Sequence, residues 1–424
     1  MVLQKLALLK LLIPYSLGLV WWGSFTSPLC AQDPDSTMVV IGLAEEQDTQ
    51  YVDSTKIIED AALDIAQDRG LFIVTPDDRM QLRILGSVRY LVVYDDIELS
   101  SKKSLITYEI PAGNAGARLP NYYNGLTQSR LGFEVTRFTP EGNVFVRLET
   151  DFAGTNGFRI RHAYGQYNNF IFGQTWSLFG SVSSLPATVG FSGPTGGILA
   201  RTPQIRYTLR NLIPASILSL GLEYFKPDLQ LPDTLAVKSF QLIPDLTARI
   251  EKNLPWGNLQ LSAILPIITG RSTEGNYVLR PGWGVNMSAV VDSWAGGKWY
   301  IHATAGRAIA RFFHDLAGQG LDLLYDPAQS VSVIPFTWGG FVTFEQNWSE
   351  KILSNFSYGT LFLETPDFVP DEAYFRGGNL RFNAFWSIVE GARIGAEFIH
   401  ATKMDRGGSV GTANRVNLLF YYDF

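Results

Sequence analysis

The sequence predicts an all-β protein: a transmembrane antiparallel β-barrel of about 16 strands with a short N-terminal periplasmic extension. Three observations predict it. Segments of strand length with alternating apolar and polar residues follow one another over residues 80–424. An apolar leader stands at the N-terminus, and the last alternating segment ends on Phe424.

Composition supports β-structure without deciding where the protein resides. The 424 residues include 27 Phe, 18 Tyr, 10 Trp and 40 Gly, against 4 His and 1 Cys. Aromatic residues are enriched in strands. The formal net charge is −6 and no basic run occurs, so we expect no binding of nucleic acid. With 46% hydrophobic and 17% charged residues, the composition would also suit a soluble enzyme. The strand pattern must therefore distinguish a membrane barrel from a soluble protein.

Residues 1–31 have the features of a secretory signal peptide. Lys5 and Lys10 precede or flank an apolar run that ends near Trp22, and small residues lead to a cleavage point after Ala31. A transmembrane anchor is one alternative, and a lipoprotein signal at Cys30 is another. Cleavage would remove the only cysteine and two lysines, so the exported chain would have no disulfide. No later run of about 18 apolar residues could form a spanning helix.

Residues 32–79 differ from the rest of the chain. This stretch is acidic and has only a weak apolar stripe, although Asp53 could cap a short helix that ends at Gly70. We predict a small periplasmic extension here, with a flexible leader as the alternative. The barrel is predicted over residues 80–424.

Alternation continues through the predicted barrel. Over residues 82–94 apolar side chains occupy even positions, whereas Arg83, Ser87 and Arg89 occupy odd ones. The same pattern recurs near residues 144–151, 204–210, 246–251 and 380–398, and over 158–164 it places Tyr164 with Phe158 and Ile160 on the outer face. A soluble β-sandwich is the competing fold. The strand face that carries the charged residues is too polar to form the core of such a sandwich. Aromatic residues at strand ends suit interfacial girdles: Tyr90, Tyr94, Phe138, Phe152, Tyr164, Tyr167, Trp283, Trp299, Trp338 and Trp386.

Connections alternate between tight and long. Residues 139–143, 168–169 and 389–391 are turn-like, whereas 95–128, 180–203, 307–335 and 361–376 are long and rich in Gly, Pro and Asp. Short turns at one end and long loops at the other are typical of an outer-membrane barrel. The final strand alternates up to Phe424, an ending that the barrel-assembly machinery of the bacterial outer membrane is expected to read.

Several segments resemble one family. Residues 129–135 (SRLGFEV), 149–152 (ETDF), 159–165 (RIRHAYG), 173–177 (GQTWS) and 201–207 (RTPQIRY) look like the early strands of DcaP-like outer-membrane porins, in order and spacing. The resemblance covers about residues 80–225. It implies a homotrimeric channel in the outer membrane of a Gram-negative bacterium, with dicarboxylates and other small anions as solutes. The N-terminal coiled coil that this family often carries would need heptads, which residues 33–79 lack.

A porin performs no bond chemistry, so we expect its selectivity to be steric and electrostatic. Arginine suits anions because its guanidinium stays charged and donates two hydrogen bonds to a carboxylate. We predict passive diffusion of small anionic solutes through a lumen lined by Arg130, Arg147, Arg159, Arg161, Arg206 and Arg210. The alternative is that these arginines form structural ion pairs with Glu134, Glu149 and Asp151.

The loop over residues 180–200 is uncharged and rich in Gly, Ser and Pro, including Ser183, Pro186, Gly193 and Pro194. We predict that it folds into the lumen as a constriction, an ordinary surface loop being the alternative.

Other classes of protein have less support. A barrel enzyme of the lipase or esterase type would need a nucleophile with a base. His162 is expected to face outward, and His302 faces the lumen without a serine motif beside it. The sequence has neither G-x-S-x-G nor His-Glu-x-x-His. Residues 33–79 are too short for the plug of a TonB-dependent transporter, and an adhesion barrel would not conduct. Nothing indicates a cofactor or a metal site, and the expected partners are outer-membrane lipid and lipopolysaccharide.

Overall fold

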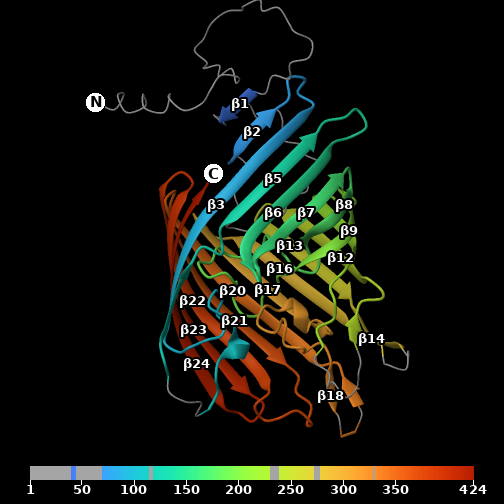
Figure 1. Cartoon of the computed structure of the whole chain (residues 1–424), viewed down its shortest axis with the longest axis vertical. Coiled ribbons are helices and arrows are strands. Elements are labelled where there is room, and N and C mark those ends of the chain that lie inside the picture. Colours follow the sequence, from blue (N-terminus) through green and yellow to red (C-terminus); the bar gives the residue numbers. More distant parts are fainter. Residues whose placement is uncertain are drawn as a thin grey trace, which may run out of the picture. The chain divides into compact units, whose positions relative to one another are not determined.

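The computed structural model describes residues 40–43, 69–113, 118–229, 238–271, 277–326, 328–329 and 331–424. Within them, 16 antiparallel strands form a barrel that closes because β3 pairs with β5 on one side and with β24 on the other (Figure 1). The predicted fold class is confirmed. In barrel order the strands are β3 (Met80–Asp95), β5 (Arg130–Arg137), β6 (Val144–Gly154), β7 (Gly157–Tyr167), β8 (Phe170–Trp176), β9 (Arg201–Arg210), β10 (Ser216–Glu223), β12 (Asp245–Leu254), β13 (Gly257–Leu265), β16 (Trp283–Asp292), β17 (Gly297–Arg307), β20 (Phe336–Ser349), β21 (Ile352–Leu363), β22 (Tyr374–Val389), β23 (Ala392–Asp405) and β24 (Val410–Asp423).

Smaller elements extend this barrel. β4 (Asn121–Gly125) pairs with the end of β3, and β1 (Val40–Leu43) pairs with β2 (Leu71–Val74). In the long connections, β11 (Lys238–Phe240), β14 (Ile267–Arg271) and β15 (Tyr277–Pro281) form one sheet, and β18 (Leu324–Asp326) and β19 (Val331–Val333) form another. The described part of the chain includes two short 3-10 helices, η2 (Thr107–Glu109) and η4 (Ala310–Phe312). Among the described residues, no helix is long and apolar enough to cross a membrane.

Side chains alternate between the outer face and the interior as the sequence predicts. On β3, Val88, Tyr90 and Tyr94 are exposed, whereas Arg83 and Arg89 are buried inside the ring. Aromatic side chains occupy the outer face on most strands, as girdles require. Of the ten predicted girdle residues, all are exposed except Phe138, which is half-buried, and Tyr164, which is buried.

Tyr164 and His162 face inward, and the prediction for both residues was wrong. The reason is a β-bulge: Glu149 pairs with His162 and Thr150 pairs with Ile160, so Arg161 is an extra residue on β7. A bulge shifts the alternation by one residue. Arg161 and His162 are therefore both buried in the interior although they are adjacent in sequence, while Ile160 stays on the outer face.

The two ends of the barrel differ as expected. Short connections at one end include residues 138–143, 168–169, 255–256, 350–351 and 390–391. Six of the eight connections at the other end are long, whereas residues 155–156 and 406–409 form tight turns there; the long ones span residues 96–129, 177–200, 224–244, 266–282, 308–335 and 364–373. Figure 1 shows β14 and β18, which belong to these long connections, at the end of the barrel opposite β2.

Closure of the barrel involves the last residue. The backbone of Phe424 exchanges two hydrogen bonds with Gly86 on β3, each 2.9 Å long. Beyond this point β2 pairs with residues 81–84 of β3, so it continues along the same edge as β24. The Phe424 ring lies over Gly86, so that a Cβ at this position would lie 2.2 Å from the ring and the ring would have to turn aside.

Candidate pore constriction

Inward side chains of β3, β5 and β6 begin a ladder of ion pairs. The Arg83 guanidinium lies 3.1 Å from the Glu134 carboxylate. Arg147 lies 3.6 Å from Glu134 and 2.6 Å from Glu149. Each of these side chains is at most 4% exposed. Such buried charges are tolerated because each one faces an opposite charge.

The ladder continues along β7. Arg161 lies 2.6 Å from Glu149 and 3.3 Å from Asp151. Arg159 makes two hydrogen bonds to Asp151, from Nε at 3.0 Å and from Nη2 at 2.6 Å. The bulge at Arg161 makes this spacing possible, since it brings two arginines of β7 against neighbouring carboxylates of β6.

The six arginines predicted to line the lumen do not form one group. Arg130, Arg147, Arg159 and Arg161 belong to the ladder, Arg130 at 4.0 Å from Glu149. Arg206 lies on β9, buried, and donates to the Trp176 carbonyl oxygen at 2.6 Å and to Gln204 at 3.0 Å. Arg210 is half-buried at the short-turn end of β9. The ladder also includes Arg83. The alternation over residues 82–94 places Arg83 on the inner face, but it was not among the six arginines predicted to line the lumen.

The loop over residues 177–200 runs inside the ring, held by side chains of several strands. The Phe179 carbonyl oxygen accepts from Ser262 on β13 at 2.6 Å. Further on, Asn355 of β21 and Asn383 of β22 each donate to the Ala187 carbonyl oxygen at 3.0 Å. The loop therefore follows the inner wall from β13 to β22.

The loop tip reaches the opposite part of the wall. The Gly190 amide donates to Glu397 on β23 at 2.8 Å, and the Ser192 carbonyl oxygen accepts from Arg381 on β22 at 3.0 Å. Between them, the Phe191 ring lies 5.1 Å from the Arg159 guanidinium carbon. The tip thus contacts side chains from β22 and β23 as well as the ladder on β7. Of the loop residues singled out from the sequence, Pro186 and Pro194 are buried, Gly193 is half-buried and Ser183 is exposed.

A second segment, residues 308–316, also packs inside the ring, which we did not predict. Phe312, Phe313 and Leu316 form a buried apolar cluster with Phe179 and Ile198 of the first loop. Ile198 and Phe313 form an isolated backbone bridge. The signal was present in the sequence, because residues 308–313 (AIARFF) are unusually apolar for a loop.

Charged groups anchor this second segment. Arg311 lies 2.6 Å from Asp245 on β12 and 2.9 Å from Asp322, and all three side chains are buried. Asp315 accepts two hydrogen bonds from Thr107, each 2.7 Å long. Burial lowers the pKa of the neighbouring His314, with Asp315 opposing the shift and the charges of Arg381 and Arg159 adding to it.

A sealed barrel with an apolar outer band, a charged interior and inward loops defines an outer-membrane protein of the porin class. The family model described as DcaP outer membrane protein matches residues 48–266, more than half of the chain. The chain belongs to this family, which confirms both the resemblance and the outer-membrane location.

Solved structures show the same fold. The crystal structure of the outer membrane channel DcaP of Acinetobacter baumannii is 21% identical, with a TM-score of 0.71 over 82% of this chain and 98% of that one. An anion-selective porin from Comamonas acidovorans is 12% identical, with a TM-score of 0.55 over 81% and 100%. Salmonella typhi OmpF, in complex with daunomycin, is 11% identical, with a TM-score of 0.52 over 82% and 99%. Comparison with curated proteins found no match.

Proposed function

We propose that this porin passes small anionic solutes, dicarboxylates among them, by passive diffusion. The observation that carries the proposal is the composition of the ladder, which joins Arg83, Arg130, Arg147, Arg159 and Arg161 to three carboxylates. An excess of positive charge in a narrow passage with low-dielectric walls raises the local concentration of anions.

The loop over residues 177–200 is the proposed constriction. Its described contacts hold it against the inner wall, and its tip meets the ladder where Phe191 lies on Arg159. Because the loop carries no charged residue, the electrostatic field at this level comes from the wall. Solutes would then pass beside the neutral loop, within the field of the arginine ladder.

Processing and assembly follow the same proposal. Residues 1–31 act as a signal peptide, residues 32–79 form a periplasmic extension, and Phe424 marks the final strand for the assembly machinery. The channel assembles as a homotrimer. The pairing of Phe424 with Gly86 at barrel closure supports a role for the terminal residue in completing the ring.

A planar bilayer containing the refolded protein under a salt gradient tests the proposal. We expect discrete conductance steps and a reversal potential on the anion side. A dicarboxylate such as succinate should carry measurable current when it replaces chloride. A cation-side reversal potential would overturn the anion preference, and a folded barrel without conductance would overturn the channel function.

A further inference from the structure

On the outer face of β21–β24, polar side chains replace apolar ones towards the long-loop end. Cross-strand pairing groups outward residues into rows, and one row is wholly apolar: Phe356, Phe382, Phe398 and Val416. Two rows further along, the partners are Thr360, Gly378, Thr402 and Thr412. The row of threonines therefore interrupts the apolar surface of the outer face, which resumes in the next row at Phe362, Met404 and Val410.

Arg376 lies in the next row beyond the threonines, on the same outward parity. It lies six positions before Phe382, which is about 20 Å along an extended strand. A charged side chain is costly in hydrocarbon but suited to the polar headgroup zone at this height. Arg376 is therefore placed where it can meet headgroups.

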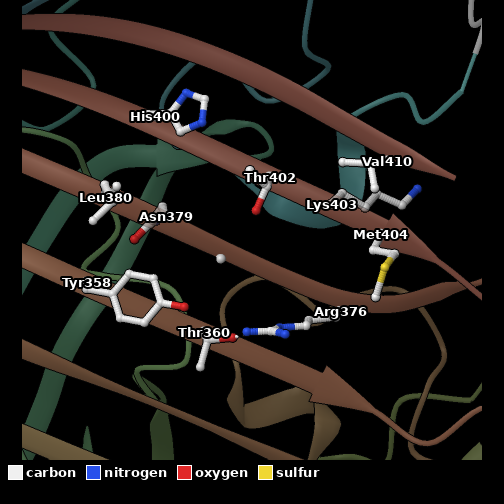
Figure 2. A pocket seen from close by; sticks show the side chains of 11 residues that line it. Tyr358, Thr360, Arg376, Asn379, Leu380, His400, Thr402, Lys403, Met404 and Val410 are labelled. Carbon is white, nitrogen blue, oxygen red and sulfur yellow. Dashed lines mark hydrogen bonds between the residues drawn. The ribbon is translucent and has the colours of Figure 1, made fainter. Parts of the chain in front are cut away.

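A groove of about 290 Å³ surrounds this arginine. Side chains of Tyr358, Thr360 and Thr402 line it, together with Leu380, Met404 and Val410. Figure 2 shows the Arg376 guanidinium directed towards Thr360, with the hydroxyl groups of Tyr358 and Thr402 pointing into the same space. Gly378 contributes no side chain, so the middle of the groove stays open.

Charge complementarity identifies the kind of occupant. Arg376 is exposed, and its Nε lies 3.4 Å from the Thr360 hydroxyl oxygen. Among the described residues, no carboxylate lies within ion-pair distance of Arg376. This contrasts with the ladder arginines Arg83, Arg147 and Arg161, each of which lies within 3.1 Å of a carboxylate. An accessible guanidinium beside hydroxyl groups matches the oxygens of a phosphate group.

His400 adds a fixed polar group at the apolar side of the groove. Asn414 donates from Nδ2 to Asp96 at 2.7 Å, which leaves its Oδ1 to accept from His400 Nδ1 at 2.8 Å. The other ring nitrogen of His400, Nε2, is then left to form a hydrogen bond with a hydroxyl group of a ligand. A ligand that carries hydroxyl groups, phosphate and apolar chains would satisfy every part of this surface.

We propose that the groove between β21, β22 and β23 binds the phosphorylated sugar headgroup of an outer-leaflet glycolipid. Arg376 holds the phosphate, Thr360 and Thr402 contact the headgroup, and the acyl chains descend over the Phe356–Phe382–Phe398 row. The site is on the outer wall, so it is independent of the proposed channel function.

Direct binding tests the site. Wild-type protein in a nonionic, phosphate-free detergent is titrated with bisphosphorylated lipid A, and bound lipid is counted by native mass spectrometry. Arg376→Gln should weaken binding by about tenfold or more, since charge-assisted hydrogen bonds to the phosphate are lost. Arg280→Gln is the matched control, because Arg280 is exposed on β15, away from the groove, and it should bind lipid as the wild type does.

A second arm needs no variant. Fully dephosphorylated lipid A should bind the wild type about as weakly as Arg376→Gln binds the bisphosphorylated form. Equal binding of phosphorylated and phosphate-free lipid A would overturn the proposal, as would equal binding by the two variants. If millimolar inorganic phosphate competes fully, the groove is an anion site and not a lipid site. If Arg376→Gln instead dissociates the oligomer, the groove is a subunit interface, and the lipid proposal fails.

Discussion

Phe191, in the inward loop, lies over the guanidinium of Arg159, with 5.1 Å between the ring centroid and Cζ. The Arg159 side chain is 37% exposed, whereas Arg147 and Arg161 of the same ladder are 2% and 4% exposed. Arg159 is therefore the ladder arginine that a passing solute can reach most directly. The buried arginines act on the solute only through their field.

Arg159→Glu should move the reversal potential towards cations, because it reverses an accessible charge beside the loop tip. The measurement is the zero-current potential under a tenfold salt gradient. Lys226→Glu is a control for the change in net charge, since Lys226 is exposed in the long connection between β10 and β12. The same shift in both variants would mean that the overall surface charge, not Arg159, sets the preference.

Arg161→Gln should act on stability more than on selectivity. Its loss leaves the buried Glu149 and Asp151 with fewer positive partners, and breaking a buried ion pair in this way costs about 3–5 kcal/mol. We expect the urea midpoint of unfolding in detergent to fall. A combined Arg161→Gln and Glu149→Gln variant should lose less than the sum of the two single changes. Additive losses would show that the two side chains do not stabilise each other.

The barrel could be predicted from the sequence because one rule governs every strand: apolar side chains that face lipid alternate with polar side chains that face the lumen. The pattern over residues 82–94 placed Arg83 and Arg89 inside and Tyr90 and Tyr94 outside, as the structure has them. The rule fails where a β-bulge inserts an extra residue into a strand. The bulge at Arg161 leaves no mark in the alternation, so His162 and Tyr164 were assigned to the wrong face.

The interior could be predicted only in part. The inward arginines and their acidic partners could be recognised in the sequence. Which of these charges meet depends on strand register. Arg206, for example, donates to a backbone carbonyl oxygen. The inward packing of residues 308–316 depends on contacts with Phe179 and Ile198, more than 100 positions away in the sequence. Local periodicity carries no information about such contacts.

Gly86→Ala should impair barrel closure. A methyl group there would lie 2.2 Å from the Phe424 ring, so the ring must move or the closing hydrogen bonds must lengthen. Overpacking in a core costs about 1–3 kcal/mol, and we expect a loss near the lower end because the Phe424 side chain is 46% exposed and can turn aside. The measurement is the fraction of protein that reaches the heat-modifiable folded form. Gly165→Ala is the control, because a methyl group at Gly165 would have only one atom within 4 Å, at 3.9 Å. Equal folding of both variants would contradict a role for this contact.

The inward packing of residues 308–316 should weaken on acidification. Burial lowers the pKa of His314, with Asp315 opposing the shift and Arg381 and Arg159 adding to it, and its Nε2 is enclosed without a hydrogen-bond partner. The packed loop therefore holds a neutral imidazole, whereas a detached loop would take up a proton near pH 6.5. The contribution of the neutral His314 to the stability of the packed loop is therefore fully present above that pH and is lost as the pH falls below it. A segment that detaches and repacks inside the lumen would interrupt the current, so we expect conductance fluctuations to become more frequent from pH 7.5 to 4.5.

His314→Gln should remove the part of this change that belongs to the histidine, since glutamine does not titrate. An unaltered pH profile in His314→Gln would assign the fluctuations to another group, and Asp315→Asn would then test the adjacent carboxylate, which holds Thr107.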